Sequence, residues 1–294
     1  MSESYAADAA GLVERSAAAF IAAVPGQPAD NGYFGPGSVT WRVASDLSAP
    51  VAGLRALLMQ ALHPLAMAGV DQHSDWRRDP VGRLAATSAY LATVTFGDRA
   101  AADRVAARVR RVHEHVRGEF DGERYTASDP TLLLWVHATF VDSGLVACTL
   151  FGNTAFGTPA DADAYVREMA ISAALLGVPE ELIPTDSASL SSFITSLVPR
   201  LALTPAAQDS ASYLLDPPGM EEEIADLWQE IRNAVLISLP SWALHLYGLP
   251  AMAPLTAAGR KETRDSLGVL DAVFMGEPGV LEARQRITLR MRAA

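Results

Sequence analysis

The sequence predicts an all-α protein. Alanine, leucine, arginine and glutamate dominate the composition, and these residues have high intrinsic helix propensity. Segments in which apolar and polar residues alternate strictly, the pattern of a half-buried strand, are scarce. With 294 residues, half of them apolar, the chain is long enough to bury a large core. No internal repeat or low-complexity linker marks a boundary, so we expect one helical domain over residues 1–294.

Capping residues and prolines divide the chain into helices. The pairs Asp79-Pro80 and Asp129-Pro130 each place a capping carboxylate before a proline that favours the first helical turn. Pro64 interrupts a longer helix, where it removes a backbone hydrogen bond and should produce a kink. Gly118 is expected to end the helix that Asp98 begins, before a loop. In chain order, the expected helices cover residues 5–23, 38–43, 48–69, 80–96, 98–118, 130–151, 161–176, 187–201, 205–214, 221–238, 240–247, 261–274 and 278–291.

The charge and the cysteine content exclude several classes of function. A formal net charge of −11 repels phosphate backbones, so nucleic acid is not an expected partner. Cys148 is the single cysteine, which excludes an intrachain disulfide and a zinc site built from several thiolates. The chain also lacks a glycine-rich phosphate loop, a Cys-x-x-Cys-His haem attachment motif, a His-Glu-x-x-His motif, a paired Glu-x-x-His motif and a Gly-x-Ser-x-Gly elbow.

Residues 132–151 have about the length of a membrane span. They include His137 and Asp142, however, and polar groups of this kind favour a core helix in which Asp142 is paired with an arginine or a histidine. We therefore expect no membrane span. The first residues lack the basic region followed by an apolar stretch that marks a secretory signal, and we expect the protein in the cytoplasm.

The histidines are unevenly distributed, because five of the six fall between residues 63 and 137. Taken singly, each is more often a hydrogen-bonded or exposed residue than a ligand. His113 borders a predicted apolar stripe of valines at positions 105, 109, 112 and 116, with Arg110 and Arg117 on its flank. An imidazole in this position suits a partly buried ligand, whereas His115 should face solvent.

Arg83, Thr87, Tyr90 and Val94 form one line on the helix expected over residues 80–96. A buried arginine needs an anion, and no acidic residue lies one turn away. Three explanations stay open: a distant carboxylate, the acid group of a bound cofactor, or an arginine that ties two helices together.

Several segments, read together, carry a family resemblance. In chain order they are Gln60-Ala61-Leu62-His63-Pro64, Ala68-Gly69-Val70, His73-Ser74, Asp79-Pro80, Arg83-Leu84 with Thr87 and Tyr90, Thr95-Phe96-Gly97-Asp98, Val112-His113-x-x-Val116-Arg117-Gly118, Asp129-Pro130 and Trp135-Val136-His137-Ala138-Thr139. The chain resembles the haem-binding helical family of latex-clearing protein (rubber oxygenase) and mycophenolic acid oxygenase B. The resemblance covers about residues 33–247.

This resemblance implies non-covalent haem b in a globin-like helical core, with additional helices at both ends of the chain. It makes His113 the proximal iron ligand and places Arg83 and Thr87 on the distal side or near a propionate. The residues that the resemblance also places at the cofactor are His63, His73, Tyr90, Trp135 and His137. Latex-clearing members carry a lysine directly before the threonine, whereas this chain has Ala86, which argues against a lysine-capped iron and against rubber as the substrate.

We therefore expect a haem-dependent oxidoreductase, an oxygenase that uses O₂ or peroxide on a hydrophobic small molecule. Arg83, Thr87 and His63 are the predicted catalytic residues, with His63 as a distal acid/base or second ligand. Two alternatives stay open. One is a non-catalytic electron carrier or sensor in which His63 and His113 clamp the iron, and the other is a cofactor-free binding protein for a hydrophobic ligand.

Overall fold

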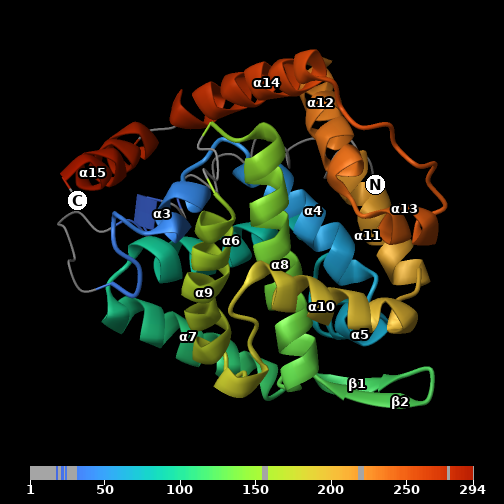
Figure 1. The fold of residues 1–294 in the computed structure, drawn as a ribbon. Helices are drawn as coiled ribbons and strands as arrows, with labels where there is room; N and C mark the ends of the chain where they lie inside the picture. The colour runs from blue at the N-terminus through green and yellow to red at the C-terminus, as the bar shows by residue number, and fades with distance from the viewer. Residues whose placement is uncertain are drawn as a thin grey trace.

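The computed structural model describes residues 32–153, 158–217, 222–276 and 279–293, together with residues 18, 21, 22 and 24. Helices account for most of these residues, so the predicted all-α class is confirmed (Figure 1). The helix predicted over residues 5–23 lies outside the described residues, apart from isolated positions.

The helices have the following bounds. They are α3 (Val39–Ala44), α4 (Ala49–Ala61), α5 (Pro64–His73), α6 (Pro80–Phe96), α7 (Arg99–His113), α8 (Pro130–Phe151), α9 (Pro159–Leu175), α10 (Ser187–Leu197), α11 (Pro205–Leu215), α12 (Glu222–Ser238), α13 (Ser241–Leu246), α14 (Ala257–Gly276) and α15 (Val280–Ala293), with short 3₁₀ turns η1 (Glu180–Leu182) and η2 (Val198–Arg200). Two strands, β1 (Arg117–Phe120) and β2 (Glu123–Thr126), form an antiparallel hairpin.

The predicted caps begin most of these helices. The side chains of Ser38, Asp79, Asp98 and Asp129 accept hydrogen bonds from backbone N–H groups in the first turns of α3, α6, α7 and α8. These bonds satisfy donors that have no partner within the helix. Ser48 precedes α4 without capping it, because its hydroxyl donates to Asp46 Oδ1 at 2.6 Å instead.

The predicted kink at Pro64 is a full break between two helices. His63 has an extended backbone (φ −84°, ψ 110°), and the axes of α4 and α5 differ by 101°. A residue before proline avoids the helical conformation, so the chain turns at His63 rather than bending gradually. The single helix predicted over residues 48–69 is therefore wrong, and the corner carries His63.

The helix predicted over residues 98–118 is also wrong at its end. α7 stops at His113, and the residues assigned to its last turn and to the following loop form the β1–β2 hairpin. Asp121 (φ 51°) and Gly122 (φ 78°) turn this hairpin in the left-handed conformation that an Asp-Gly pair favours. Gly118 lies within β1, where a Cβ atom would stand 2.7 Å from the Tyr125 hydroxyl, so close strand packing explains this glycine.

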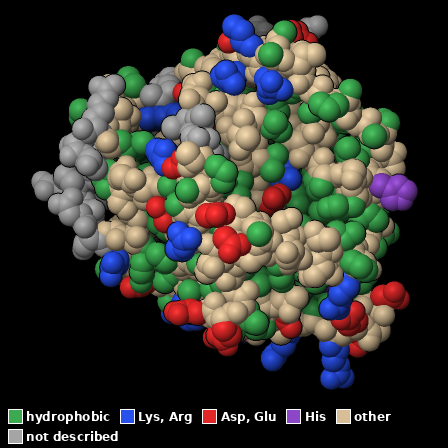
Figure 2. All heavy atoms as spheres, viewed as in Figure 1, with side chains coloured by type: hydrophobic (Ala, Val, Ile, Leu, Met, Phe, Trp, Pro, Cys, Tyr) green, Lys and Arg blue, Asp and Glu red, His purple; other side chains and the backbone are tan. Residues whose placement is uncertain are grey.

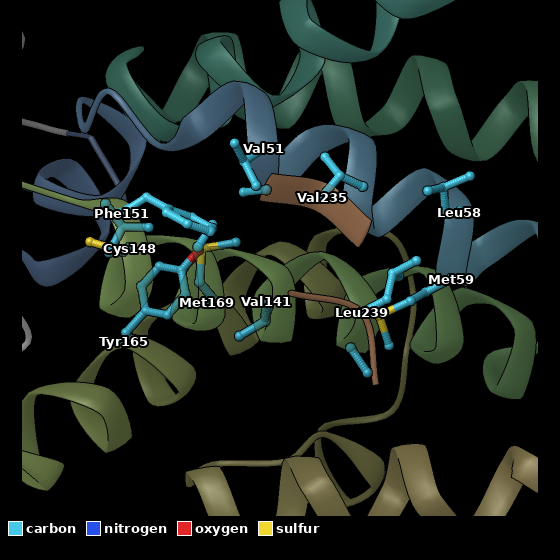
Figure 3. Packing of buried hydrophobic residues seen from close by; sticks show 14 of the residues in the cluster. Val51, Leu58, Met59, Val141, Cys148, Phe151, Tyr165, Met169, Val235 and Leu239 are labelled. Atoms are coloured by element: carbon cyan, nitrogen blue, oxygen red, sulfur yellow. The ribbon is translucent and has the colours of Figure 1, made fainter. Parts of the chain in front are cut away.

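The core lies where α4, α8, α9 and α12 meet (Figure 3). α4 contributes Val51, Leu58 and Met59 to this core, and α8 contributes Val141 and Phe151 (Figure 3). α8 and the bent α4–α5 pair are long and apolar enough to cross a membrane, but 61% of the apolar stretch of α8 is buried within the fold. The predicted core position of α8 is confirmed.

A buried ion pair joins the two central helices. Arg55 of α4 is 3% exposed and places Nη1 2.8 Å from Asp142 Oδ2 of α8. The same guanidinium donates to Ser143 Oγ at 2.8 Å and to the Ser238 carbonyl at 2.9 Å. The predicted pairing of Asp142 with an arginine is therefore confirmed. All of the charge of Arg55 is compensated within the protein.

We expect Asp142→Asn to lower the free energy of unfolding by about 3 kcal/mol, because it leaves the Arg55 guanidinium buried without an anion. Urea denaturation would measure this loss. Asp265→Asn is the matched control, since Asp265 pairs with Lys261 on the surface of α14 and should contribute less than about 1 kcal/mol. Equal stabilities of the two variants would contradict a structural role for the buried pair.

Candidate functional site

The candidate site is built around the last residue of α7. The buried face of α7 carries Ala102 and Ala106, and His113 follows Ala106 by seven residues on the same face. The predicted valine stripe is wrong at Val112, which is 56% exposed. Small alanines occupy the inward face instead, which allows α7 to pack closely against α6. His113 therefore points inward from α7.

The His113 imidazole has no partner within the described chain. Its Nδ1 is buried without a hydrogen bond, whereas Nε2 forms no hydrogen bond to a described residue and is open to solvent-sized space. Burial lowers the pKa of His113, and the nearby Arg83 cation lowers it further. The ring is thus held neutral with an accessible nitrogen, the form that ligates metal ions.

Arg83 lies on α6, close enough to His113 to affect its pKa. Its side chain has exposed surface, and yet desolvation lowers the pKa of its guanidinium. No ion pair or side-chain hydrogen bond joins Arg83 to any described residue. The missing acidic partner that the sequence predicted is therefore not supplied by this part of the chain.

Thr87 and Tyr90 follow Arg83 along α6. The Thr87 hydroxyl donates to the Arg83 carbonyl at 3.1 Å, one turn back. The Tyr90 hydroxyl is buried without a hydrogen-bond partner, and burial raises the pKa of Tyr90 to about 12. At neutral pH this line of α6 therefore carries the Arg83 cation, the Thr87 hydroxyl and the protonated phenol of Tyr90.

His137 lies on α8 and is partly buried. Desolvation alone lowers its pKa to about 4. Its ring forms no hydrogen bond within the described residues. α9 connects this region to α7, because Arg110 donates to the carbonyl of Leu175 at the end of α9.

The structure places His63 in a different environment from His113. His63 is 1% exposed, both of its ring nitrogens are buried without partners, and its ring centroid lies 6.1 Å from that of Trp135. It lines a cavity of about 290 Å³ beneath β2 and the start of α8. Burial lowers the pKa of His63, with a further contribution from Arg200. Arg83, which affects the pKa of His113, is not among the residues that affect His63.

The other predicted site residues lie around this cavity or on the surface. Trp135 is fully buried, and its indole donates to the Gln60 carbonyl at 3.3 Å. His73 is exposed and stands edge-on to Tyr125, with ring centroids 6.3 Å apart. His115 is exposed, as predicted. The structure therefore places Arg83, Thr87 and Tyr90 on α6 and His113 at the end of the adjacent α7, while His63 lines the cavity beneath β2 and His73 is exposed.

The cavity beside His63 includes residues that the sequence did not single out as site residues. Arg200 approaches Glu123 of β2 at 2.6 Å, and Tyr125 donates to Gln72 at 2.8 Å. Arg200 and Glu123 are separated by 77 positions in the chain, so no local spacing could have predicted this pair. No group of three or more side chains able to hold a metal ion exists among the described residues.

A comparison with protein families gives one match. The family described as "ER-bound oxygenase mpaB/B'/Rubber oxygenase, catalytic domain" matches residues 41–270. The match begins later and ends farther along the chain than the predicted resemblance over residues 33–247. No curated protein and no solved structure matches the chain.

We expect His137 to make the stability of the protein depend on pH. Between pH 6.5 and pH 4 the unfolded chain binds a proton at His137 that the folded protein does not bind. As the pH falls through this range, His137 therefore lowers the free energy of unfolding by about 3 kcal/mol. His137→Gln should reduce the slope of stability against pH in urea titrations. His115→Gln, which removes an exposed imidazole, serves as the control. An unchanged slope in His137→Gln would contradict the enclosed position of His137.

Proposed function

This chain belongs to the family of mpaB/B′ and rubber oxygenase catalytic domains, and we propose on that basis that it is a haem-dependent oxygenase acting on a hydrophobic small molecule. The observation that carries the haem proposal is the juxtaposition of two unsatisfied groups. His113 offers an accessible nitrogen, and Arg83 offers a desolvated cation without an anion.

These residues fit haem b. A neutral histidine is a common proximal ligand of haem iron. The propionates of haem are carboxylates, and a desolvated arginine without an acidic partner is suited to bind one through charge-assisted hydrogen bonds. The chemistry therefore matches at two points, a nitrogen ligand and an anion-binding cation, that lie on adjacent helices.

When bound, haem supplies the iron at which O₂ or peroxide is activated. The protein's own contribution is to position and to shield the reactants. Arg83 anchors an acid group at the edge of the site. Thr87 and Tyr90 lie one and two turns farther along α6. The Thr87 hydroxyl donates to the Arg83 carbonyl, whereas the Tyr90 hydroxyl has no partner among the described residues and stays protonated at neutral pH because its pKa is about 12.

The class of substrate follows from the composition of the same wall. Between its polar residues α6 carries Leu84, Ala86 and Ala89, which are not fully buried by the protein. Solvent-accessible apolar side chains beside the proposed cofactor favour a hydrophobic ligand. Burial of His137 on α8 lowers its pKa to about 4, so its ring is neutral at pH 7. Ala86 in place of the family's lysine leaves a small side chain beside Thr87.

The separate surroundings of His63 favour the oxygenase over a protein in which His63 and His113 clamp the iron from both sides. The charges that affect the pKa of His63 belong to the β1–β2 region and to Arg200, whereas Arg83 affects that of His113. The role of His63 as a distal acid/base or second ligand stays a prediction.

We expect the purified protein to bind hemin with a Soret absorption band and His113→Ala to lose most of this binding, because the variant lacks the proposed iron ligand. Absorption spectra of the oxidised and reduced protein, recorded during hemin titration, would measure the effect. His73→Ala removes an exposed histidine and should bind hemin like the wild type. Full retention of hemin by His113→Ala would move the ligand assignment to His63 or His137, and no Soret band in the wild type would exclude haem binding.

Arg83→Met should weaken hemin binding by about tenfold while preserving the Soret position, since it removes a charge-assisted hydrogen bond but not the iron ligand. The measurement is hemin transfer from the protein to an excess of apomyoglobin. Arg108→Met is the control, because Arg108 is exposed on the other side of α7. Equal transfer rates for the two variants would contradict the role of Arg83 as a propionate anchor.

A further inference from the structure

The cavity of about 290 Å³ beneath β2 and the start of α8 is separate from the site on α6 and α7. The residues that line it come from the corner before α5, from α5, β2, the start of α8 and the end of η2. Liquid water occupies roughly 30 Å³ per molecule, so the cavity has room for a small organic molecule rather than for one bound water. We refer to it as the His63 cavity.

His63 brings an incomplete imidazole to this cavity. The residue is 1% exposed, and both of its ring nitrogens are buried without a hydrogen-bond partner. The charged groups that act on its pKa are Arg200, Glu123 and Asp129, and all three line the cavity, which places the ring on the cavity side. Burial lowers the pKa of His63, so the ring is neutral at pH 7 and offers one N–H donor and one acceptor nitrogen.

The charged side chains that line the His63 cavity balance one another. Arg200 approaches Glu123 at 2.6 Å, and the Asp129 carboxylate accepts hydrogen bonds from two backbone N–H groups at the start of α8. With Arg124, the lining holds two cations and two carboxylates. Figure 2 shows basic and acidic side chains intermixed around the β1–β2 hairpin, at the lower right of the view. A lining without net charge gives an ion little attraction to offset the loss of its hydration, so it favours an uncharged ligand.

Apolar side chains supply another part of the lining. Leu65 of α5 and Leu132 of α8 are 8% and 7% exposed, and they belong to one small buried cluster with Tyr125. The Tyr125 hydroxyl already donates to Gln72 at 2.8 Å. The His63 cavity therefore combines apolar side chains with a polar group that lacks a partner, and ligand sites typically use such polar groups to orient an apolar molecule.

We propose that the His63 cavity binds a small uncharged molecule that carries a hydroxyl group on an apolar body, an alcohol or a phenol. A hydroxyl both donates and accepts hydrogen bonds, so it can complete either nitrogen of a neutral imidazole. The apolar body contacts Leu65 and Leu132. Binding is non-covalent and does not depend on haem, because His113 and Arg83 lie outside the cavity.

The test compares four probes that share one aromatic body: benzyl alcohol, benzoate, benzylamine and toluene. We expect the full chain without hemin to bind benzyl alcohol with a Kd on the order of 1 mM, a usual affinity for so small a molecule. The two charged probes, and toluene without a hydroxyl, should bind at least about fivefold more weakly. Ligand-observed NMR would measure the four affinities.

The position of the bound probe is measured on His63 itself. In protein with isotope-labelled histidine, benzyl alcohol should shift the ring-nitrogen signal that is absent from the spectrum of His63→Leu. This variant should bind benzyl alcohol at least about tenfold more weakly, because it lacks the polar partner. Its melting temperature should equal or exceed that of the wild type, since the substitution breaks no hydrogen bond of the ring within the described chain. His73→Leu, which removes an exposed imidazole of α5, is the matched control and should bind like the wild type.

A second pair of variants tests the cavity without changing His63. Thr131 is exposed at the second position of α8 and lines the cavity, so Thr131→Trp should fill it and abolish binding. Thr149→Trp places the same side chain at an exposed position of α8 outside the cavity and should have no effect. This pair decides the matter if His63→Leu does not fold.

Four results would overturn the proposal. They are tighter binding of a charged probe than of benzyl alcohol, equal binding of toluene, an unshifted His63 signal, and full binding by Thr131→Trp. Absence of binding by every probe would also overturn it and leave the cavity to water alone. Because these titrations contain no hemin, failure of hemin to bind would overturn the proposed function and leave the result at His63 standing.

Discussion

The buried guanidinium of Arg55 joins the helices on which both histidine environments depend. It connects α4 to Asp142 and Ser143 of α8 and to the last turn of α12. α4 ends at the corner occupied by His63, and α8 carries Trp135 and His137. Desolvation lowers the pKa of Arg55, while Asp142 opposes this change. The protein can keep such a charge in its core because each contact of the guanidinium is provided internally.

Arg83 provides the contrast that identifies the site. Desolvation lowers the pKa of both arginines, but no described carboxylate opposes the change at Arg83. Arg83 is exposed whereas Arg55 is 3% exposed, so water can solvate the charge of Arg83. An acid group of a ligand, as proposed for this site, would supply the anion that the described residues do not.

Much of the fold follows from local chemistry that the sequence displays. Aspartates before prolines begin α6 and α8, and the apolar run of α8 with its internal Asp142 predicts a core helix with a paired acid. The hairpin was missed although Asp121-Gly122 is a strong turn signal, because its strands have only four residues and little alternation of polarity. Periodicity also misplaced the buried face of α7, since small alanines rather than valines pack there.

The relation between the histidines could not be predicted from spacing. His63 and His113 belong to one run of family motifs, and yet the break at Pro64 and the hairpin give His63 its own cavity, closed by Arg200 from far along the chain. Such an arrangement depends on tertiary packing, which sequence periodicity does not encode.

Three buried polar groups along α4 to α7 share one property: His63, Tyr90 and His113 have atoms without hydrogen-bond partners. Each such atom costs about 1–3 kcal/mol in a folded protein unless water or a ligand completes it. Arg55, which is 3% exposed, has Asp142, Ser143 and the Ser238 carbonyl as partners, so the chain is able to provide partners in its core. Buried atoms without partners also occur at Ser45, Ser187 and Trp228, so the proximity of Arg83 to His113, rather than the missing bonds alone, is what supports an external partner at this site.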